Sequence, residues 1–293
     1  MVAAPTILWL RRDLRLDDNP ALASALERGG PVVPVFIWDS ARQSGSAPGA
    51  ASRAWLHRSL ASLDARFRRL GTRLVLRQGD TTRSLLDLIE ETGAGSVVWN
   101  RCHEPFLIKR DTGIKESLFA AGLDVRSFNG SLLFSPSRIE NKSGQPFKVF
   151  TAFWKHCLTL PVRSVIPLGI KTWPTLKKRV RSETLDALEL RPASDWDSSM
   201  LRDWSPGEIS AQDRLDHFAR EVAGNYATDR DRPDRDGTSR LSPHLHWGEI
   251  SPVQVFHRIR ETGAGKGGEV FLSEVGWREF AGHLLFHYPH TVD

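Results

Sequence analysis

The chain has 293 residues, 40% of them hydrophobic, and this length suits about two domains, or one domain and an incomplete second. Lysine and arginine exceed aspartate and glutamate by 40 to 35, which allows an anionic partner without naming one and equally suits a solvated, mildly basic surface. Cys102 and Cys157 match no metal-binding spacing and no apolar run reaches the roughly 18 residues of a membrane span, so we expect a cytoplasmic protein without disulfides, metal or membrane segment.

The first 130 residues alternate short β-rich runs with helical patterns. This alternation predicts βαβ units and a parallel sheet. Arginines rather than a small-residue cleavage site follow the first apolar run, which therefore reads as a buried strand and not as a secretory signal. The expected strands are Thr6–Leu10, Val32–Trp38, Leu74–Arg77, Ser96–Trp99 and Asp124–Phe128.

Two expected helices lie between these strands. Asn19 can cap a first turn that opens with Pro20, whose fixed φ and missing N–H suit that position. Further on, apolar residues keep helical spacing through an arginine-rich segment, which predicts a helix with one buried and one wet, basic face. These residues are Trp55, Leu56, Leu60, Leu63, Phe67 and Leu70.

The segment 131–205 is expected to be a connector between an α/β domain at 1–130 and a helical domain at 206–293. Prolines recur in it, Lys177–Arg181 forms a basic run, and a loop this long is improbable inside one compact domain. Helices are expected after it at Ile209–Ala223, at Val253–Glu261 behind a Ser251 and Pro252 start, and from about Glu269 to His287.

Several motifs in the second half have ordinary explanations. The glycines of 263–268 fit GxGxxG but follow a helix, so a loop between helices is favoured over nucleotide binding. His244 and His246 lack metal partners at familiar spacing and are expected to be structural. The alternating charges of 229–236 suit a solvated loop. No P-loop, GxSxG or HExxH motif occurs, so hydrolysis of ATP, serine hydrolysis and zinc proteolysis lose their usual support.

Two segments are better candidates for a site. Residues 237–245 concentrate hydroxyls and backbone N–H groups just before a helix start that contains proline, and such a turn can hold phosphate, although a helix cap explains it too. Phe271, Glu274, Trp277 and Arg278 follow at helical spacing and are expected to lie near one another. A carboxylate, large rings and a guanidinium on one face suit a nucleobase pocket.

Four ordered motifs make the chain resemble the DNA photolyase and cryptochrome family over essentially its whole length. They are the opening signature Trp9–Asn19, the connector motif Pro146–Trp154, and the flavin and DNA motifs Thr238–Pro243 and Trp277–Phe280. Within the family, the residues look most like a class I photolyase that repairs cyclobutane pyrimidine dimers. The resemblance also implies that the helical domain continues well beyond Asp293, so that this chain is truncated within it.

The resemblance implies an antenna-type α/β domain, a connector and a helical domain that binds FAD and DNA containing pyrimidine dimers, and we expect a monomer. It implies that light-excited reduced flavin donates an electron to open the dimer. Glu274 and Trp277 would face the flipped dimer, and Arg230 and Arg278 would contact DNA. The FAD site would be lined by Tyr226, Thr238, Ser239, Arg240, Leu241, Ser242 and Phe271.

The antenna chromophore and the substrate stay open within the family. Phe106 and Leu107 stand where folate-binding members carry an Asn-Glu pair, so a folate and a deazaflavin type remain alternatives. A (6-4) photolyase and a cryptochrome-like light sensor without repair activity are the alternative functions.

Overall fold

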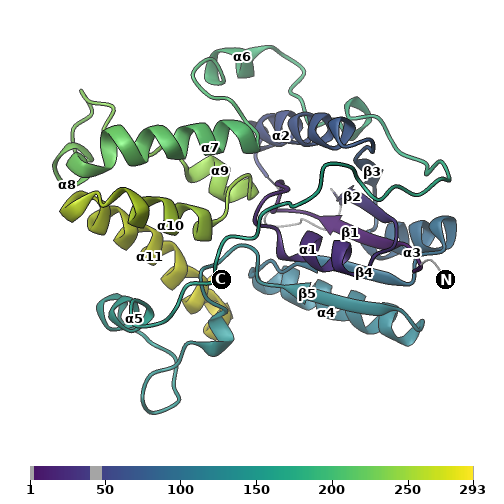
Figure 1. Ribbon diagram of the computed structural model, residues 1–293, viewed down its shortest axis with the longest axis horizontal. Coiled ribbons are helices and arrows are strands. Elements are labelled where there is room, and N and C mark those ends of the chain that lie inside the picture. The colour runs from purple at the N-terminus through teal and green to yellow at the C-terminus, as the bar shows by residue number, and fades with distance from the viewer. Residues whose placement is uncertain (1–2, 40–47, 293) are drawn as a thin grey trace.

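The computed structural model describes residues 3–39 and 48–292, and in this part of the chain a five-stranded sheet lies beside a group of helices (Figure 1). Residues 1, 2, 40–47 and 293, which belong to the expected first and last domains, lie outside the described residues. The strand order is β3-β2-β1-β4-β5, and every neighbouring pair is parallel. The expected α/β fold with a parallel sheet is confirmed. The strands are β1 (Thr6–Leu10), β2 (Val32–Trp38), β3 (Val75–Gln78), β4 (Ser96–Asn100) and β5 (Asp124–Phe128).

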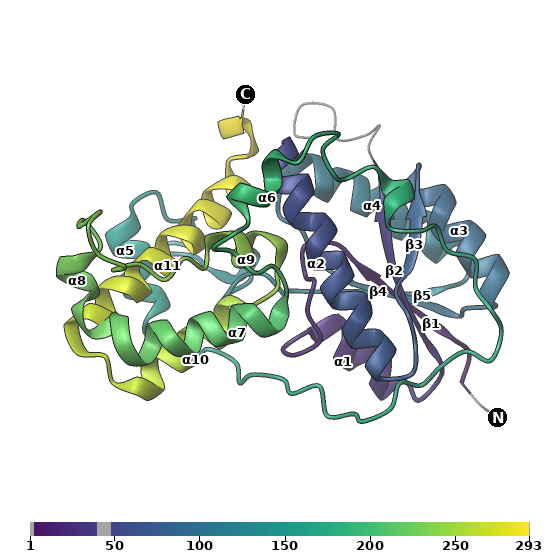
Figure 2. The ribbon, with the colours of Figure 1, turned by 90° about the horizontal axis from the view of Figure 1, so that it is seen from above.

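Successive side chains of each strand point to opposite faces of the sheet, and this alternation divides the core into two layers. Leu8 and Leu10 of β1 pack on one face of the sheet, against α1 (Pro20–Glu27) and α2 (Ala50–Arg69). Ile7 and Trp9 pack on the other face, against α3 (Thr81–Thr92) and α4 (Pro105–Ala120). Figure 2 shows α3 and α4 on the side of the sheet opposite to α1 and α2. Because both faces are covered, the strands read as continuous apolar runs.

The expected start of α1 is confirmed: Pro20 occupies its first turn, and the Asn19 side chain accepts a hydrogen bond from the Leu22 amide at 3.1 Å. Five of the six apolar residues expected on one face of α2 are buried, and Leu70, which caps the helix, is half-buried.

The segment after β5 contains only short helices and returns along the α/β part (Figure 2). The Trp173 amide donates to the Leu70 carbonyl at 2.9 Å, and the Glu183 amide donates to the Leu76 carbonyl at 2.9 Å. This segment therefore runs beside the edge strand β3. Its helices are η1 (Pro136–Arg138), α5 (Phe150–Cys157), η2 (Asp186–Leu188) and α6 (Trp196–Met200).

The helical part differs from the sequence expectation in two places. The helix expected at Ile209–Ala223 becomes α7 (Glu208–His217), a π-helical turn η3 (Phe218–Val222), η4 (Ala223–Asn225) and α8 (Tyr226–Asp229). The following helices are α9 (Ser242–Trp247), α10 (Pro252–Thr262), α11 (Gly265–His287) and η5 (Pro289–Val292). Ser251 and Pro252 start α10 as expected, with a capping box between Ser251 and Gln254.

The glycines expected to form a loop are largely helical, because α11 begins at Gly265. A Cβ on Gly267 would lie 2.1 Å from the Ala223 carbonyl oxygen, so α11 packs backbone to backbone against η4. The loop interpretation therefore holds only for the turn at Gly263 and Ala264, since close packing overrides the poor helix propensity of glycine.

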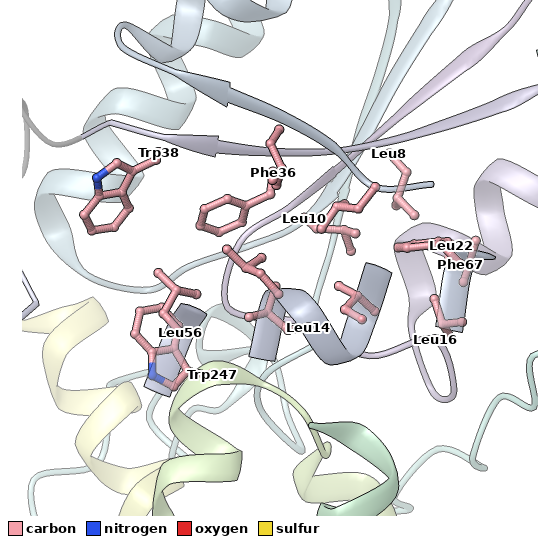
Figure 3. Close-up of a cluster of buried hydrophobic side chains, with 14 of the residues drawn as sticks. Leu8, Leu10, Leu14, Leu16, Leu22, Phe36, Trp38, Leu56, Phe67 and Trp247 are labelled. Carbon is pink, nitrogen blue, oxygen red and sulfur yellow. The ribbon is translucent and has the colours of Figure 1, made fainter. Parts of the chain in front are cut away.

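Trp247 attaches α9 to the α/β core. Its ring is buried in the same cluster as Leu14 and Leu56, and Figure 3 shows these side chains facing one another. The start of α9, which carries the suspected flavin motif, is therefore fixed relative to the carboxyl ends of the strands. Among the described residues, no helix combines the length and apolarity needed to cross a membrane.

Candidate functional site

A cavity of about 520 Å³ lies where the carboxyl ends of β1 and β4 meet α8, α9 and α11. This volume falls within the range of ordinary ligand sites, and the position beyond the carboxyl ends of parallel strands is where open α/β sheets bind ligands. On the helical side, the cavity is lined by Tyr226, Ser239, Ser242, Leu245, His246, Phe271, Glu274, Val275, Arg278, Gly282 and Leu285. On the other side it is lined by Arg12, Asp13, Asn100, Arg101, Cys102, His103, Glu104, Ser131 and Leu132.

Two aromatic rings form the floor of the helical wall. Phe271 lies 5.3 Å from Tyr226 with the rings at 84°, and both pack against Phe218. Burial raises the pKa of Tyr226, so its hydroxyl stays protonated near neutral pH and can donate a hydrogen bond. This part of the site offers flat apolar surface with one polar group.

Glu274 is the carboxylate of the helical wall and is held by Arg230. The Arg230 Nη1 lies 2.5 Å from the Glu274 Oε1, and this hydrogen bond raises the pKa of the guanidinium. The Arg230 guanidinium also lies 5.3 Å from the Tyr226 ring. Arg230 does not line the cavity but orients the carboxylate that does.

The wall from the α/β part carries charges of both signs, the guanidinium groups of Arg12 and Arg101 and the carboxylates of Asp13 and Glu104. Arg12, Arg101 and His103 face the cavity, and Arg12 forms an ion pair with Glu104. Burial, assisted by the nearby Arg101, lowers the pKa of His103 to about 4, so this imidazole is neutral near pH 7. The His103 Nε2 is buried without a hydrogen-bond partner among the described residues, so the wall presents a polar group that a ligand could satisfy.

Arg278 and Glu279 tie α11 to the segment after β5. The Arg278 Nη1 donates to the Ser131 carbonyl at 2.7 Å, and the Leu133 amide donates to the Glu279 carboxylate at 2.7 Å. Burial raises the pKa of Glu279 to about 7 despite the opposing influence of Arg278. The two residues therefore fix the position of α11, which forms part of the cavity wall, relative to the segment after β5.

We predict that Glu279 makes stability fall with rising pH. Its folded pKa of about 7 exceeds the ordinary value of 4.5, so between these values the folded state binds the extra proton. Relative to Glu279→Gln, which keeps an acceptor for the Leu133 amide, the wild-type protein should lose roughly 1 to 3 kcal/mol of stability between pH 5 and pH 8. Urea unfolding of both proteins at the two pH values measures this. An equal change for the two proteins would contradict the prediction.

Six of the residues that the resemblance implies as functional line this one cavity, although they come from three separate segments. They are Tyr226, Ser239, Ser242, Phe271, Glu274 and Arg278. Thr238, Arg240 and Leu241 lie in the same motif but do not line it. Leu241 is buried in the helical core, and Arg240 forms an ion pair with Asp236 at 3.0 Å. The roles of all these residues stay predictions.

Trp277 does not line the cavity with Glu274 and Phe271, although its helical spacing predicts that the three residues lie near one another. Instead, its ring stacks on Phe150 of α5, with the centroids 3.8 Å apart and the planes at 11°, and it is 49% exposed. The physical reason is the packing of α5 against α11, which offers the indole a parallel ring beside the cavity rather than in it.

The residues of the α/β wall were not predicted as site residues. A signal for them exists, because Arg12 follows β1 and Arg101 follows β4, and side chains that follow parallel strands meet at one edge of a sheet. The expectation that His244 is structural is confirmed by its buried hydrogen bond to Glu249, whereas His246 lines the cavity. Among the residues described, no group of three or more His, Cys, Asp or Glu side chains is placed to hold a metal ion.

A smaller hollow of about 60 Å³ lies at the carboxyl ends of β1 and β2. Trp38, Arg110 and Trp247 contribute to it, together with Phe106 and Leu107, the two residues on which the expectation for the antenna chromophore depends. The wall is apolar and aromatic at these two positions, and that expectation stays a prediction.

The family model described as DNA photolyase matches residues 6–168. The chain belongs to the DNA photolyase family. It is 44% identical over 299 aligned residues to a deoxyribodipyrimidine photo-lyase of Agrobacterium fabrum, covering 98% of this chain and 60% of that one. It is 38% identical to cryptochrome-1 of Arabidopsis thaliana, covering 98% of this chain and 44% of the plant protein.

The fold agrees with a solved structure of a family member. A crystal structure of a bacterial class III photolyase from Agrobacterium tumefaciens matches with a TM-score of 0.92 and 43% identity, over 99% of this chain and 60% of that one. This likeness corrects the expectation of a class I enzyme. The chain spans about 60% of the length of these two photolyases.

Proposed function

We propose that this chain contributes the α/β part and the first part of the flavin site of a photolyase that uses light to repair cyclobutane pyrimidine dimers in DNA. The observation that carries the proposal is the convergence of Tyr226, Ser239 and Ser242 with Phe271 and Glu274 on one cavity. Ser239 and Ser242 belong to the motif Thr238–Pro243, which resembles a flavin motif of the family, and Phe271 and Glu274 lie on α11, the helix that also carries the motif Trp277–Phe280.

The cavity residues suit FAD. The hydroxyls of Ser239 and Ser242 can donate to a diphosphate, and Tyr226 and Phe271 offer flat surface to a ring. The unpartnered His103 Nε2 provides a further polar contact on the opposite wall. FAD, when bound, supplies the light-driven electron that opens the cyclobutane ring. No residue of the site is then required as a general base.

The residues of this chain would bind and orient the damaged bases. The Glu274 carboxyl group would hydrogen-bond to the polar edge of a flipped pyrimidine, while Arg230 keeps it in place. Trp277, half exposed beside the cavity, would stack on a flipped base, which returns about 1 to 3 kcal/mol against a flipping cost of a few kcal/mol. Arg278, on the cavity wall, would contact the DNA backbone.

We predict that Trp277→Ala weakens binding of an oligonucleotide with one thymine dimer by about 5- to 100-fold and leaves binding of the intact oligonucleotide nearly unchanged, because one stacking contact is lost. Fluorescence anisotropy with the two oligonucleotides measures this. Trp196→Ala, which removes a ring of similar exposure on α6, is the matched control and should leave the preference intact. If Trp277→Ala does not alter the preference for damaged DNA, the assignment of Trp277 to the substrate is wrong.

A light sensor of the cryptochrome type is the second candidate, favoured by the 38% identity to a plant cryptochrome. The two functions differ in a measurable way. A photolyase restores dimer-containing DNA in the light and binds it in preference to intact DNA, whereas retained flavin without either property would favour the sensor.

A further inference from the structure

A second basic site lies away from the cavity, where the connector passes the carboxyl end of α2 and the start of β2. A hollow of about 430 Å³ is lined there by four cationic side chains and by no carboxylate. The cations are Arg68, Arg73, Lys178 and Arg179, and we call the hollow that they line the basic hollow. The sequence shows only part of this feature, as the basic run Lys177–Arg181.

The connector is held firmly at this place, so the charges have fixed positions. The side chain of Arg73 donates to the Val180 carbonyl, and Val180 is buried against the sheet. The Lys178 Nζ donates to the Glu91 carbonyl at 2.8 Å. These contacts use backbone carbonyls, which neutralise no charge, so both cations keep their full charge beside the hollow.

The remaining two guanidinium groups are open to solvent. Arg68 is exposed and forms an ion pair with Asp64 at 2.6 Å, whereas Arg179 is exposed and makes no ion pair with any residue that the structure describes. The hydroxyl-bearing Thr72 and Thr175 also line the hollow. Guanidinium groups with hydroxyls around a concave surface match the oxygens of phosphate groups.

We propose that the basic hollow is a second contact site for the sugar-phosphate backbone of nucleic acid, independent of base sequence and of damage. The surroundings favour nucleic acid over a lipid surface. None of the large exposed apolar side chains of the described residues belongs to the segments 64–73 or 173–185, so the hollow lacks the apolar anchor of a membrane-binding face. The Asp64 and Glu183 carboxylates line the adjacent hollow, so the basic region is bounded on that side.

The basic hollow faces away from the proposed flavin site. The flavin cavity opens at the carboxyl ends of the strands, whereas Val32, Val33 and Thr175 place the basic hollow at the amino end of β2 (Figure 2). Intact DNA that contacts the hollow therefore does not need to enter the flavin cavity, and the proposal stands or fails separately from the proposed repair activity.

The test is the salt dependence of binding to intact duplex DNA in the dark, measured by anisotropy between 50 and 200 mM salt, for which about one unit of slope is expected for each phosphate contact. The variant Arg68→Gln with Arg179→Gln should lower the slope of log K against log salt by about two. Lys109→Gln with Lys115→Gln, two exposed cations on α4, removes the same charge and should leave the slope nearly unchanged. Arg68→Lys with Arg179→Lys keeps the charge and should retain most of the wild-type slope.

Thermal unfolding of each variant serves as the control for correct folding. Asp64 keeps its hydrogen bond from the Leu74 amide when Arg68 is replaced. Equal slopes for the wild-type protein and the hollow variant would overturn the proposal, as would equal losses in the hollow and α4 variants. Loss of binding to vesicles of anionic phospholipid, with DNA binding unchanged, would assign the hollow to a lipid surface and would also overturn it.

Discussion

Glu249→Ala is expected to destabilise the protein by roughly 3 to 5 kcal/mol. Glu249 is fully buried and accepts hydrogen bonds from the Gly207 amide at 2.8 Å and the Trp55 Nε1 at 3.2 Å. Its carboxylate also binds the Ser59 hydroxyl and the His244 ring. Removing it leaves several buried polar groups without a hydrogen-bond partner, and each such group costs free energy of folding because its desolvation is no longer compensated.

Glu249 joins α2 to the segment before α7 and to α9, so it fixes the wall that carries Ser239 and Ser242. Urea unfolding of Glu249→Ala and of Ser59→Ala, which removes only one donor and should cost about 1 kcal/mol, measures the difference. Similar stabilities for the two variants would show that the network contributes little.

Gly248→Ala is expected to cost roughly 3 kcal/mol or more. Gly248 ends α9 with φ +67, a left-handed conformation that a side chain disfavours by about 1 to 2 kcal/mol. In addition, a Cβ would lie 2.0 Å from the Arg12 carbonyl oxygen, so the backbone of the β1 loop would have to move. The Arg15 side chain donates to the Gly248 carbonyl at 2.9 Å in the same junction.

Gly263→Ala is the matched control, because Gly263 also ends a helix with a positive φ of +60 but has open space around its Cβ position. It should cost only the conformational term of about 1 to 2 kcal/mol. Thermal unfolding of the two variants separates the cost of the left-handed backbone conformation from the cost of the steric clash. Equal losses would mean that the junction between α9 and the β1 loop is loose enough to accept a methyl group.

The fold was predictable from the sequence wherever a local pattern sets the structure. Buried strands such as Thr6–Leu10 are read directly from apolar runs, and the starts of α1 and α10 follow from capping residues beside proline. The start of α11 was not predictable in this way. Its glycines are poor helix formers, and they are helical because the backbone of η4 approaches Gly267.

The site was predictable only on one side. The helical wall follows from motifs that lie close together in the chain, such as Thr238–Pro243. The wall from the α/β part depends on which strands become neighbours, because Arg12 and Arg101 are brought together only by the pairing of β1 with β4. The stacking of Trp277 on Phe150 depends in the same way on the return of the connector to α11, and no local pattern encodes it.

The measurement that tests the central claim most directly is an absorption spectrum of the purified chain after incubation with FAD and passage through a desalting column. Flavin bands should stay with the wild-type protein and be weakened at least tenfold in Tyr226→Ala with Ser239→Ala, which removes a ring and a hydroxyl from the cavity wall. A colourless wild-type protein, or equal flavin retention by both, would contradict the assignment of this cavity to FAD.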